Sequence, residues 1–331
     1  MTAEAGARVA ITGGAGFLGA ALARRLLDAG SVAIGGAAPV ALRSLVLADI
    51  VAPPAPLADD PRVRVVTGDV EQLAADLGEV DLVFHLAGVV SGAAEADFDL
   101  GMHTNVDGLR AMLETLRAQP GAPVIVYSSS GAVFGQDPAL PPIGVIDDDT
   151  MPRPQSSYGI QKYLGELLVA DYTRKGFLRG RSVRLQTVSV RPGKPNAAAS
   201  SFVSGIIREP LAGQPAVCPV PPDMPVTLLS PDRTLDGILL SAAVADDVWG
   251  STTAMTFPAL TTTPREMASA LGRVAGADVA DLIEWTEDPV ITAIVGTWAE
   301  RFSTPRAVRL GLIADASVDE VIAQYAASHR V

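Results

Sequence analysis

Cysteine and histidine are almost absent from this chain of 331 residues, which has one cysteine and three histidines. The lone Cys218 cannot form an intramolecular disulfide, and no cluster of cysteine and histidine has metal-ligand spacing, so we expect no metal site. Long apolar runs are also missing, since no segment approaches the ~18 uninterrupted apolar residues of a membrane span. These absences predict a soluble cytoplasmic protein with no membrane contact.

Positive charge is scarce as well, because the formal net charge is -12. Binding to nucleic acid depends on clustered lysine and arginine, so this charge argues against a nucleic-acid partner and favours a small molecule. A chain of this length suits one large α/β domain or a main domain with a smaller lobe.

What the chain does have near its start is a glycine turn, TGGAGFLG, at residues 12–19. A short β-branched run at residues 9–11 precedes it, and leucines at helical spacing follow it. Such a strand-turn-helix unit brings the backbone close to a pyrophosphate and points helix amides at its charge. An ordinary tight turn remains the alternative. The residues of this unit that we expect to bind a dinucleotide are Gly13, Gly16, Phe17 and Leu18.

A second apolar strand, at residues 45–49, ends in Asp49. A carboxylate at this place accepts hydrogen bonds from both hydroxyls of an adenosine ribose and repels a 2′-phosphate, so it predicts NAD rather than NADP as the cofactor. The spacing from Gly13 exceeds the usual ~20 residues, which an insertion at residues 30–40 explains. The alternative is a solvent-facing aspartate at a strand end.

Further strands alternate with helices along the first part of the chain, at residues 63–67, 80–86, 124–127 and 183–190, with a helix at residues 100–116. This rhythm predicts an α/β fold with a Rossmann-type, doubly wound parallel sheet, whose ligand lies at the carboxyl ends of the strands. Positions at these ends that we expect to contact the cofactor are Asp69, Val70, Leu86, Ala87, Gly88 and Ser128.

Tyr158 and Lys162 lie four residues apart in a helix that we expect to begin near Ser156. This spacing places both side chains on one helical face. A nearby ammonium favours the phenolate, so the tyrosine has a reason for a lowered pKa and could take a proton from an alcohol. The serine cluster at residues 128–130 lies upstream in register with this pair.

Together these motifs resemble the extended short-chain dehydrogenase/reductase family, also called the NAD-dependent epimerase/dehydratase family. They include TGGAGFLG, Asp49, GDV at residues 68–70, HLAG at 85–88, SSSGAVFG at 128–135 and YGIQK at 158–162. The resemblance implies that Ser130 is the catalytic serine, Tyr158 the base, and Lys162 the residue that lowers the tyrosine pKa and holds the nicotinamide ribose. It also implies a homodimer, cofactor contacts at Arg191 and Pro192, and a mostly structural role for Asn105 beside the cofactor.

The run RPGKPNAAASSFVSGIIREPLAG, at residues 191–213, is similar to a branch of this family that oxidises the 2-hydroxyl of a four-carbon sugar acid with NAD. We therefore expect residues 1–190 to form the NAD-binding domain and residues 191–331 to form mainly a smaller α/β substrate lobe, with possible returns to the main sheet. A cation should bind the substrate carboxylate, although the main candidates, Lys194 and Arg208, could also be solvated surface charges. The residues expected at the substrate, besides Ser130 and Tyr158, are Ser91, Lys194, Asn196, Ser200, Arg208 and Arg233.

Two other functions compete with this oxidation. A nucleotide-sugar epimerase of the same family would use the same Ser130, Tyr158 and Lys162, and it stays open as the alternative. A dinucleotide-sensing regulator is disfavoured, because such a protein has no need of the three residues Ser130, Tyr158 and Lys162. The dehydratase branch carries Thr-Asp-Glu at the serine cluster, whereas this chain has Ser130-Gly131-Ala132 and offers no acid.

Overall fold

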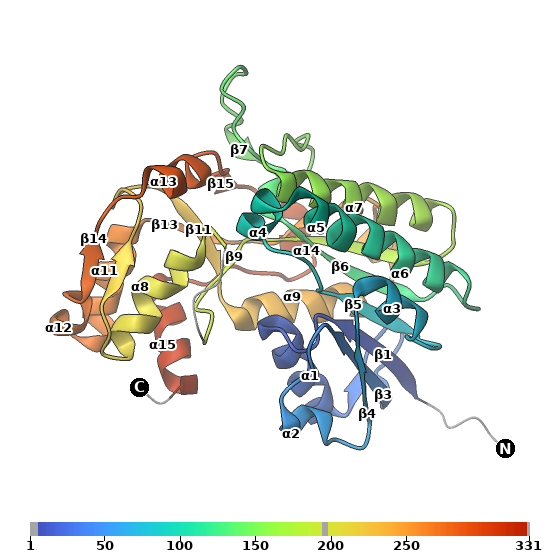
Figure 1. The fold of residues 1–331 in the computed structure, drawn as a ribbon. Helices are drawn as coiled ribbons and strands as arrows, with labels where there is room; N and C mark the ends of the chain where they lie inside the picture. The colour runs from blue at the N-terminus through green and yellow to red at the C-terminus, as the bar shows by residue number, and fades with distance from the viewer. Residues whose placement is uncertain (1–5, 194–197, 330–331) are drawn as a thin grey trace.

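An eight-stranded sheet forms the centre of the computed structural model, which describes residues 6–193 and 198–329 (Figure 1). Its strand order is β12-β8-β6-β5-β1-β3-β2, with β4 also paired to β3. All pairings are parallel except that of β2 with β3. The strands are β1 (Ala7–Thr12), β2 (Ser31–Val32), β3 (Val40–Asp49), β4 (Val63–Thr67), β5 (Leu82–His85), β6 (Val124–Ser130), β8 (Arg179–Leu185) and β12 (Met255–Thr256). This arrangement confirms the predicted doubly wound sheet.

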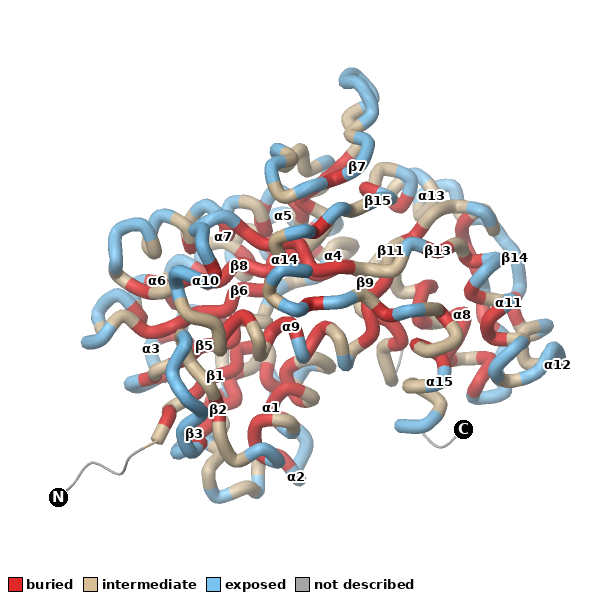
Figure 2. The backbone as a smooth tube through the Cα atoms, turned by 180° about the vertical axis from the view of Figure 1, so that it is seen from behind, coloured by how far each residue is buried: buried red, intermediate tan, exposed pale blue. Residues whose placement is uncertain are grey.

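Helices cover both faces of the sheet, which explains why most residues of its central strands are apolar. Val9 and Ile11 pack in one core with α1 (Phe17–Ala29) and α9 (Pro231–Ala243). Ala10 points to the opposite face, where α3 (Val70–Ala75), α6 (Gly108–Arg117) and α7 (Ser157–Arg174) pack. Successive side chains along a central strand therefore enter two different cores, and both sets are buried (Figure 2).

A smaller lobe lies beside the main sheet and has a core of its own (Figure 1). One small sheet has the order β13-β11-β9, and a second pairs β10 with β14. Its strands are β9 (Thr187–Val188), β10 (Ala216–Cys218), β11 (Val226–Leu229), β13 (Leu260–Thr262) and β14 (Ile283–Trp285). Its helices are α8 (Ser201–Leu211), α11 (Pro264–Ala275), α12 (Ala277–Ala280), α13 (Pro289–Val295) and α15 (Val318–His329).

The chain crosses between the two parts more than once. It leaves the main sheet after β8, enters the lobe at β9, and returns to the main sheet with α9 and β12. The two sections therefore share segments of the C-terminal half, and the proposed boundary at residue 190 stays a prediction.

The helix expected at residues 100–116 is interrupted. α5 (Phe98–Met102) leads into a π-helical turn (His103–Asp107), after which α6 continues. The turn buries Asn105, whose amide bonds the backbone of Val89 and Gln161 Oε1. A π-helical turn is common where a helix carries a side chain that must reach a particular partner.

Short elements complete the described chain. They are α2 (Ala55–Ala58), α4 (Ser91–Ala96), α10 (Asp246–Trp249), α14 (Pro305–Arg309) and the paired strands β7 (Val145–Ile146) and β15 (Arg301–Phe302). Within the described ranges, none of the helices has the length and apolar character that crossing a membrane requires. This finding does not test the cytoplasmic location, which stays a prediction.

Candidate active site

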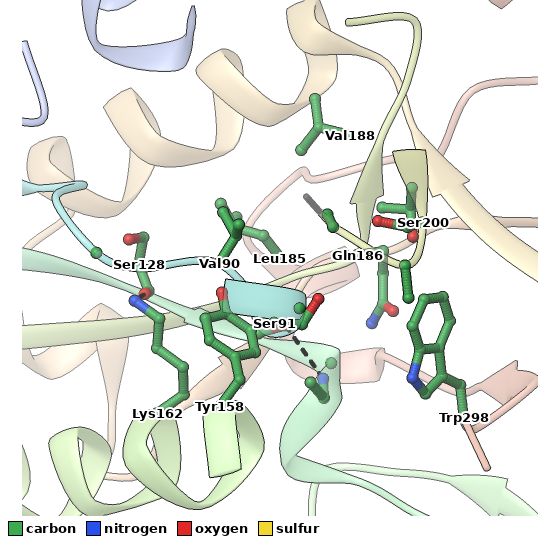
Figure 3. A pocket seen from close by; sticks show the side chains of 18 of the residues that line it. Val90, Ser91, Ser128, Tyr158, Lys162, Leu185, Gln186, Val188, Ser200 and Trp298 are labelled. Atoms are coloured by element: carbon green, nitrogen blue, oxygen red, sulfur yellow. Dashed lines mark hydrogen bonds between the residues drawn. The ribbon is translucent and has the colours of Figure 1, made fainter. Parts of the chain in front are cut away.

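A cavity of 690 Å³ lies where the carboxyl ends of the main strands meet the smaller lobe (Figure 3). The main sheet contributes the glycine turn and the ends of β3, β5 and β6. The lobe and the segments leading to it contribute Gln186, Ser200, Arg208, Thr227 and Trp298. This volume is typical of a small-molecule site, and its position is the one expected for a doubly wound sheet.

The glycine turn at one end of the cavity leaves no room for side chains. Gly13 has a φ of +73°, and a Cβ there would lie 2.9 Å from Ala87 N. A Cβ on Gly19 would lie 2.0 Å from Gly13 O, so this glycine lets α1 pack directly on the turn. Gly16 caps α1 without a side-chain bond, and both it and Phe17 line the cavity. A bare turn at a helix start fits the pyrophosphate of a dinucleotide.

Asp49 ends β3 beside this turn and lines the same cavity. Its Oδ2 accepts a hydrogen bond of 2.9 Å from Ala15 N, and its Oδ1 accepts one of 2.7 Å from Ile50 N. Two backbone amides therefore hold the carboxylate at the turn. Each carboxylate oxygen keeps further lone pairs, which can accept hydrogen bonds from ribose hydroxyls.

The other predicted cofactor residues divide into two groups. Those that line the cavity, with the turn residues above, are Leu18, Leu86, Gly88, Ser128 and Arg191. Those that do not line it are Asp69, Val70, Ala87, Asn105 and Pro192. Their roles as cofactor contacts stay predictions.

Several residues of the second group have structural partners instead. Asp69 caps α3 and accepts a hydrogen bond of 2.8 Å from Gln72 N. Val70 is buried, and its side chain fills the space that a Cβ on Gly108 would need. Asn105 Oδ1 accepts a hydrogen bond of 2.8 Å from Val89 N, so it supports the loop after β5 from behind.

Ser130 differs from its two neighbours at the end of β6, because its hydroxyl makes a hydrogen bond with the Tyr158 side chain. Ser128 Oγ donates to His85 O at 3.0 Å, and Ser129 Oγ donates to Glu166 Oε1 at 2.5 Å. Ser130 Oγ instead accepts a bond of 3.1 Å from Ala132 N. Ser130 and Tyr158 therefore lie within hydrogen-bonding reach of each other, as the binding of one substrate hydroxyl by both side chains requires.

Tyr158 and Lys162 lie on one face of α7 and point toward the end of β6 (Figure 3). Ser156 caps this helix and accepts a hydrogen bond of 3.2 Å from Gly159 N, which sets the start of the helix at Ser157, one residue before Tyr158. Lys162 Nζ donates to Ser128 O at 2.9 Å and lies 5.7 Å from the centre of the Tyr158 ring. The structure thus brings together the three residues predicted to be catalytic.

Burial dominates the pKa of Tyr158, and the expectation that Lys162 lowers this pKa stays a prediction. Burial raises the pKa of Tyr158 to about 12, and hydrogen bonding from the Ser130 side chain only partly offsets the rise. Burial also lowers the pKa of Lys162 to about 8, against the attraction of Glu166. Desolvation disfavours the charged form of both groups. For Tyr158 this effect outweighs the attraction between a phenolate and the Lys162 ammonium that the helical spacing suggested.

The predicted substrate residues are also divided by the structure. Ser91, Ser200 and Arg208 line the cavity, whereas Lys194 and Asn196 lie outside the described residues. Arg233 lies on α9, does not line the cavity, and approaches Glu320 at 3.8 Å.

Gln186, Thr227 and Trp298 line the cavity but were not predicted from the sequence. Gln186 directly follows β8, so the rule that ligands meet the carboxyl ends of parallel strands could have found it. Thr227 and Trp298 belong to the lobe, where no motif marks them. Within the described part of the chain, no group of three or more His, Cys, Asp and Glu side chains could hold a metal ion.

Comparison with known proteins adds relatives of similar length. The profile of the NAD dependent epimerase/dehydratase family matches residues 9–231. A D-erythronate dehydrogenase of Cupriavidus necator is 51% identical over 96% of this chain and 97% of its own length. A D-erythronate dehydrogenase of Haemophilus influenzae is 40% identical over 96% of this chain and 98% of its own. The crystal structure of a nucleoside-diphosphate-sugar epimerase from Agrobacterium tumefaciens superposes with a TM-score of 0.89 and 38% identity, covering 98% of this chain and 95% of that one.

Asp49→Asn should weaken the preference for NAD over NADP. The amide can still accept the hydrogen bond from Ala15 N, but it no longer repels a 2′-phosphate and makes only neutral bonds to a ribose. Since charged and neutral hydrogen bonds differ by about 1 kcal/mol, we expect the preference to fall at least about fivefold. The measurement is the dissociation constant of each dinucleotide, followed by tryptophan fluorescence. Asp76→Asn is the control, because Asp76 does not line the cavity, and an equal change in both variants would remove Asp49 from cofactor selection.

Proposed function

The chain belongs to the NAD-dependent epimerase/dehydratase family, and from this premise we propose that it oxidises the 2-hydroxyl of D-erythronate with NAD, giving 2-dehydro-D-erythronate. The observation that carries the proposal is the near full-length similarity to two D-erythronate dehydrogenases, at 51% and 40% identity. The complete set of Ser130, Tyr158 and Lys162 around one cavity supports it.

In the proposed reaction Ser130 and Tyr158 hold the 2-hydroxyl between them. Tyr158 takes the hydroxyl proton, and the hydrogen on C2 leaves as a hydride, so that C2 becomes a carbonyl. NAD, when bound, accepts that hydride and becomes NADH. Lys162, fixed by the Ser128 carbonyl, supplies positive charge near the phenol and a donor for the nicotinamide ribose.

The carboxylate of the acid needs local positive charge, because the chain as a whole is strongly acidic. Arg191 and Arg208 both line the cavity. Arg208 already donates to Arg191 O at 2.7 Å and to Glu209 Oε1 at 2.5 Å. Burial, followed by the like charge of Arg208, lowers the pKa of Arg191, and an anion beside Arg191 would relieve both effects.

These contacts lead us to propose Arg191 as the residue that binds the substrate carboxylate, with Arg208 behind it. Its Nε is buried and has no hydrogen-bond partner among the described residues. This assignment replaces the sequence-based prediction of Arg191 as a cofactor contact. The proposed carboxylate site does not include the substrate roles that the sequence predicted for Lys194, Asn196 and Arg233.

An epimerase acting on a nucleotide sugar remains the alternative, and the similar Agrobacterium structure is described as one. The two functions use the same three residues but differ in the fate of the cofactor. A dehydrogenase releases NADH, whereas an epimerase returns the hydride to its substrate. Incubation of the protein with NAD and a panel of aldonates, followed by NADH absorbance, decides between them. Absence of NADH with every acid would contradict the proposed function.

Tyr158→Phe should lower the rate of D-erythronate oxidation by about 10²- to 10⁴-fold, because the substitution removes the base and keeps the ring. Steady-state kinetics measure the loss, and the dissociation constant of NADH should change little. Tyr163→Phe on the same helix is the matched control, since Tyr163 does not line the cavity. Activity of Tyr158→Phe within a few fold of wild type would rule out this base.

The rate of oxidation should also rise with pH from about 6 to about 9, because the phenolate is the active form and the protein alone holds the tyrosine pKa near 12. Ser130→Ala should move the rise to higher pH, since hydrogen bonding from Ser130 lowers that pKa. A flat profile, or a Ser130→Ala profile at lower pH, would contradict this account.

Arg191→Met should lower kcat/KM for D-erythronate by about 10- to 150-fold, which corresponds to the ~1.5 to 3 kcal/mol of a charged hydrogen bond. The KM for NAD should stay within about twofold, which separates a substrate role from a cofactor role. Arg233→Met is the matched control, because that arginine lies outside the cavity. Equal losses in the two variants would place the carboxylate site elsewhere.

We also propose that the protein is a homodimer, as the family resemblance implies. α5 and α7 pack against each other and expose large apolar side chains. These are Phe98 and Leu100 on α5, with 61% and 45% exposure, and Ile160, Leu164 and Leu167 on α7, with 48%, 37% and 51%. A contiguous apolar patch of this kind is typical of a protein interface.

Leu164→Glu combined with Leu167→Glu should convert the dimer to a monomer, because the change buries charge at the proposed interface. Light scattering coupled to gel filtration measures the mass. Val308→Glu, at an exposed position of α14, is the control and should leave the mass unchanged. A monomeric wild type at about 50 µM would contradict the proposal, since a dimer with a dissociation constant of about 1 µM would be mostly assembled at that concentration.

A further inference from the structure

Gln186 presents a buried hydrogen-bond donor to the catalytic cavity. The residue is 8% exposed, and its Nε2 has no hydrogen-bond partner within the described structure. Buried polar groups in proteins are almost always paired, so an unpaired donor in the wall of a cavity indicates a ligand that completes it. Figure 3 shows the Gln186 side chain in the cavity, drawn between Ser91 and Trp298.

Two contacts hold the Gln186 amide in this orientation. Thr227, on β11 of the smaller lobe, donates from Oγ1 to Gln186 Oε1 at 3.2 Å. The amide also lies against Gly131, where a Cβ would come within 2.5 Å of Gln186 Oε1. Because Gly131 directly follows Ser130, the free donor lies close to the group that would hold the reacting hydroxyl.

The unpaired donors of the cavity differ in charge. Of the buried side-chain atoms without partners in the described residues, two belong to residues that line the cavity, Gln186 Nε2 and Arg191 Nε. A carboxylate pairs best with the cation, which leaves the neutral amide for a neutral acceptor. In a 2,3-dihydroxy acid the acceptor on the carbon next to the reacting carbon, apart from the carboxylate, is the 3-hydroxyl oxygen.

We propose that Gln186 Nε2 donates a hydrogen bond to the 3-hydroxyl oxygen of the substrate, and that Thr227 positions the amide for this bond. Gln186 is then a residue that determines specificity: it selects acids hydroxylated at C3 over acids that lack this group. The inference rests on the proposed function, since it refines the substrate of the same site.

The test compares D-erythronate with 2,4-dihydroxybutanoate of the same configuration at C2, which lacks only the 3-hydroxyl. The wild type should prefer D-erythronate by about 5- to 150-fold in kcat/KM, because the deoxy acid leaves a buried donor unpaired at a cost of about 1 to 3 kcal/mol. Gln186→Leu, which has no donor, should bring the two acids within about twofold of each other. Thr227→Val should reduce the preference by a smaller factor, because the amide keeps its donor and loses its anchor.

Two checks separate this effect from a loss of folding. The melting temperature and the dissociation constant of NADH should be unchanged in Gln186→Leu, and Gln186→Met, which keeps the length of the side chain but has no hydrogen-bond donor, should show the same loss of preference. Thr256→Val is the matched control, because it removes a buried and unpaired oxygen from β12, outside the cavity, and should leave the preference intact.

The outcomes are distinguishable. An unchanged preference in Gln186→Leu, or an equal loss of kcat/KM on both acids, overturns the assignment to the 3-hydroxyl and leaves the dehydrogenase function standing. A wild type that produces NADH with neither acid overturns the proposed function, and this inference with it.

Discussion

The geometry of the site depends on a buried ion pair that ties α7 to the sheet. Arg184 on β8 donates to both carboxylate oxygens of Glu166 on α7, at 2.8 and 2.7 Å, and Ser129 donates a third bond to Glu166. Loss of one partner would leave a buried charge unpaired, at a cost of about 3 to 5 kcal/mol. Because Tyr158 and Lys162 lie on the same helix, this pair also keeps them against the end of β6.

Charge and burial act against each other throughout this site. The proposed chemistry needs a phenolate at Tyr158 and an ammonium at Lys162, yet burial favours the neutral form of each. Glu166 opposes this trend by favouring the charged form of Lys162. The protein alone therefore leaves the base largely protonated near neutral pH, and a positively charged nicotinamide next to the phenol would favour its ionisation. Ionisation of Tyr158 would then depend on bound NAD, the oxidant of the proposed reaction.

The site also divides its tasks between the two parts of the fold. The main sheet carries the glycine turn, Asp49 and Ser130 at the carboxyl ends of its strands, and helix α7 beside it carries Tyr158 and Lys162. The smaller lobe contributes groups that can distinguish substrates, such as Thr227, and it meets the main sheet at the segment after β8 that contains Gln186. Changes in the lobe could alter the substrate without disturbing the cofactor site, which explains how one family includes both dehydrogenases and epimerases.

The sequence by itself determined the parts of this protein that depend on local pattern. Strands buried on both faces are mostly apolar, a tight turn with positive φ needs glycine, and Tyr158 and Lys162 share a face through helical spacing. The doubly wound sheet, the glycine turn and the proximity of Ser130, Tyr158 and Lys162 could therefore be predicted. Only the tertiary structure decided the pKa of Tyr158, because burial depends on every element packed around the ring. Only the tertiary structure brought Gln186 into contact with Thr227, which lies 41 residues away in the chain. The tertiary structure also placed Arg233 outside the cavity and Arg191 beside Arg208. Contacts between distant segments follow from packing, so they leave no local signal in the sequence.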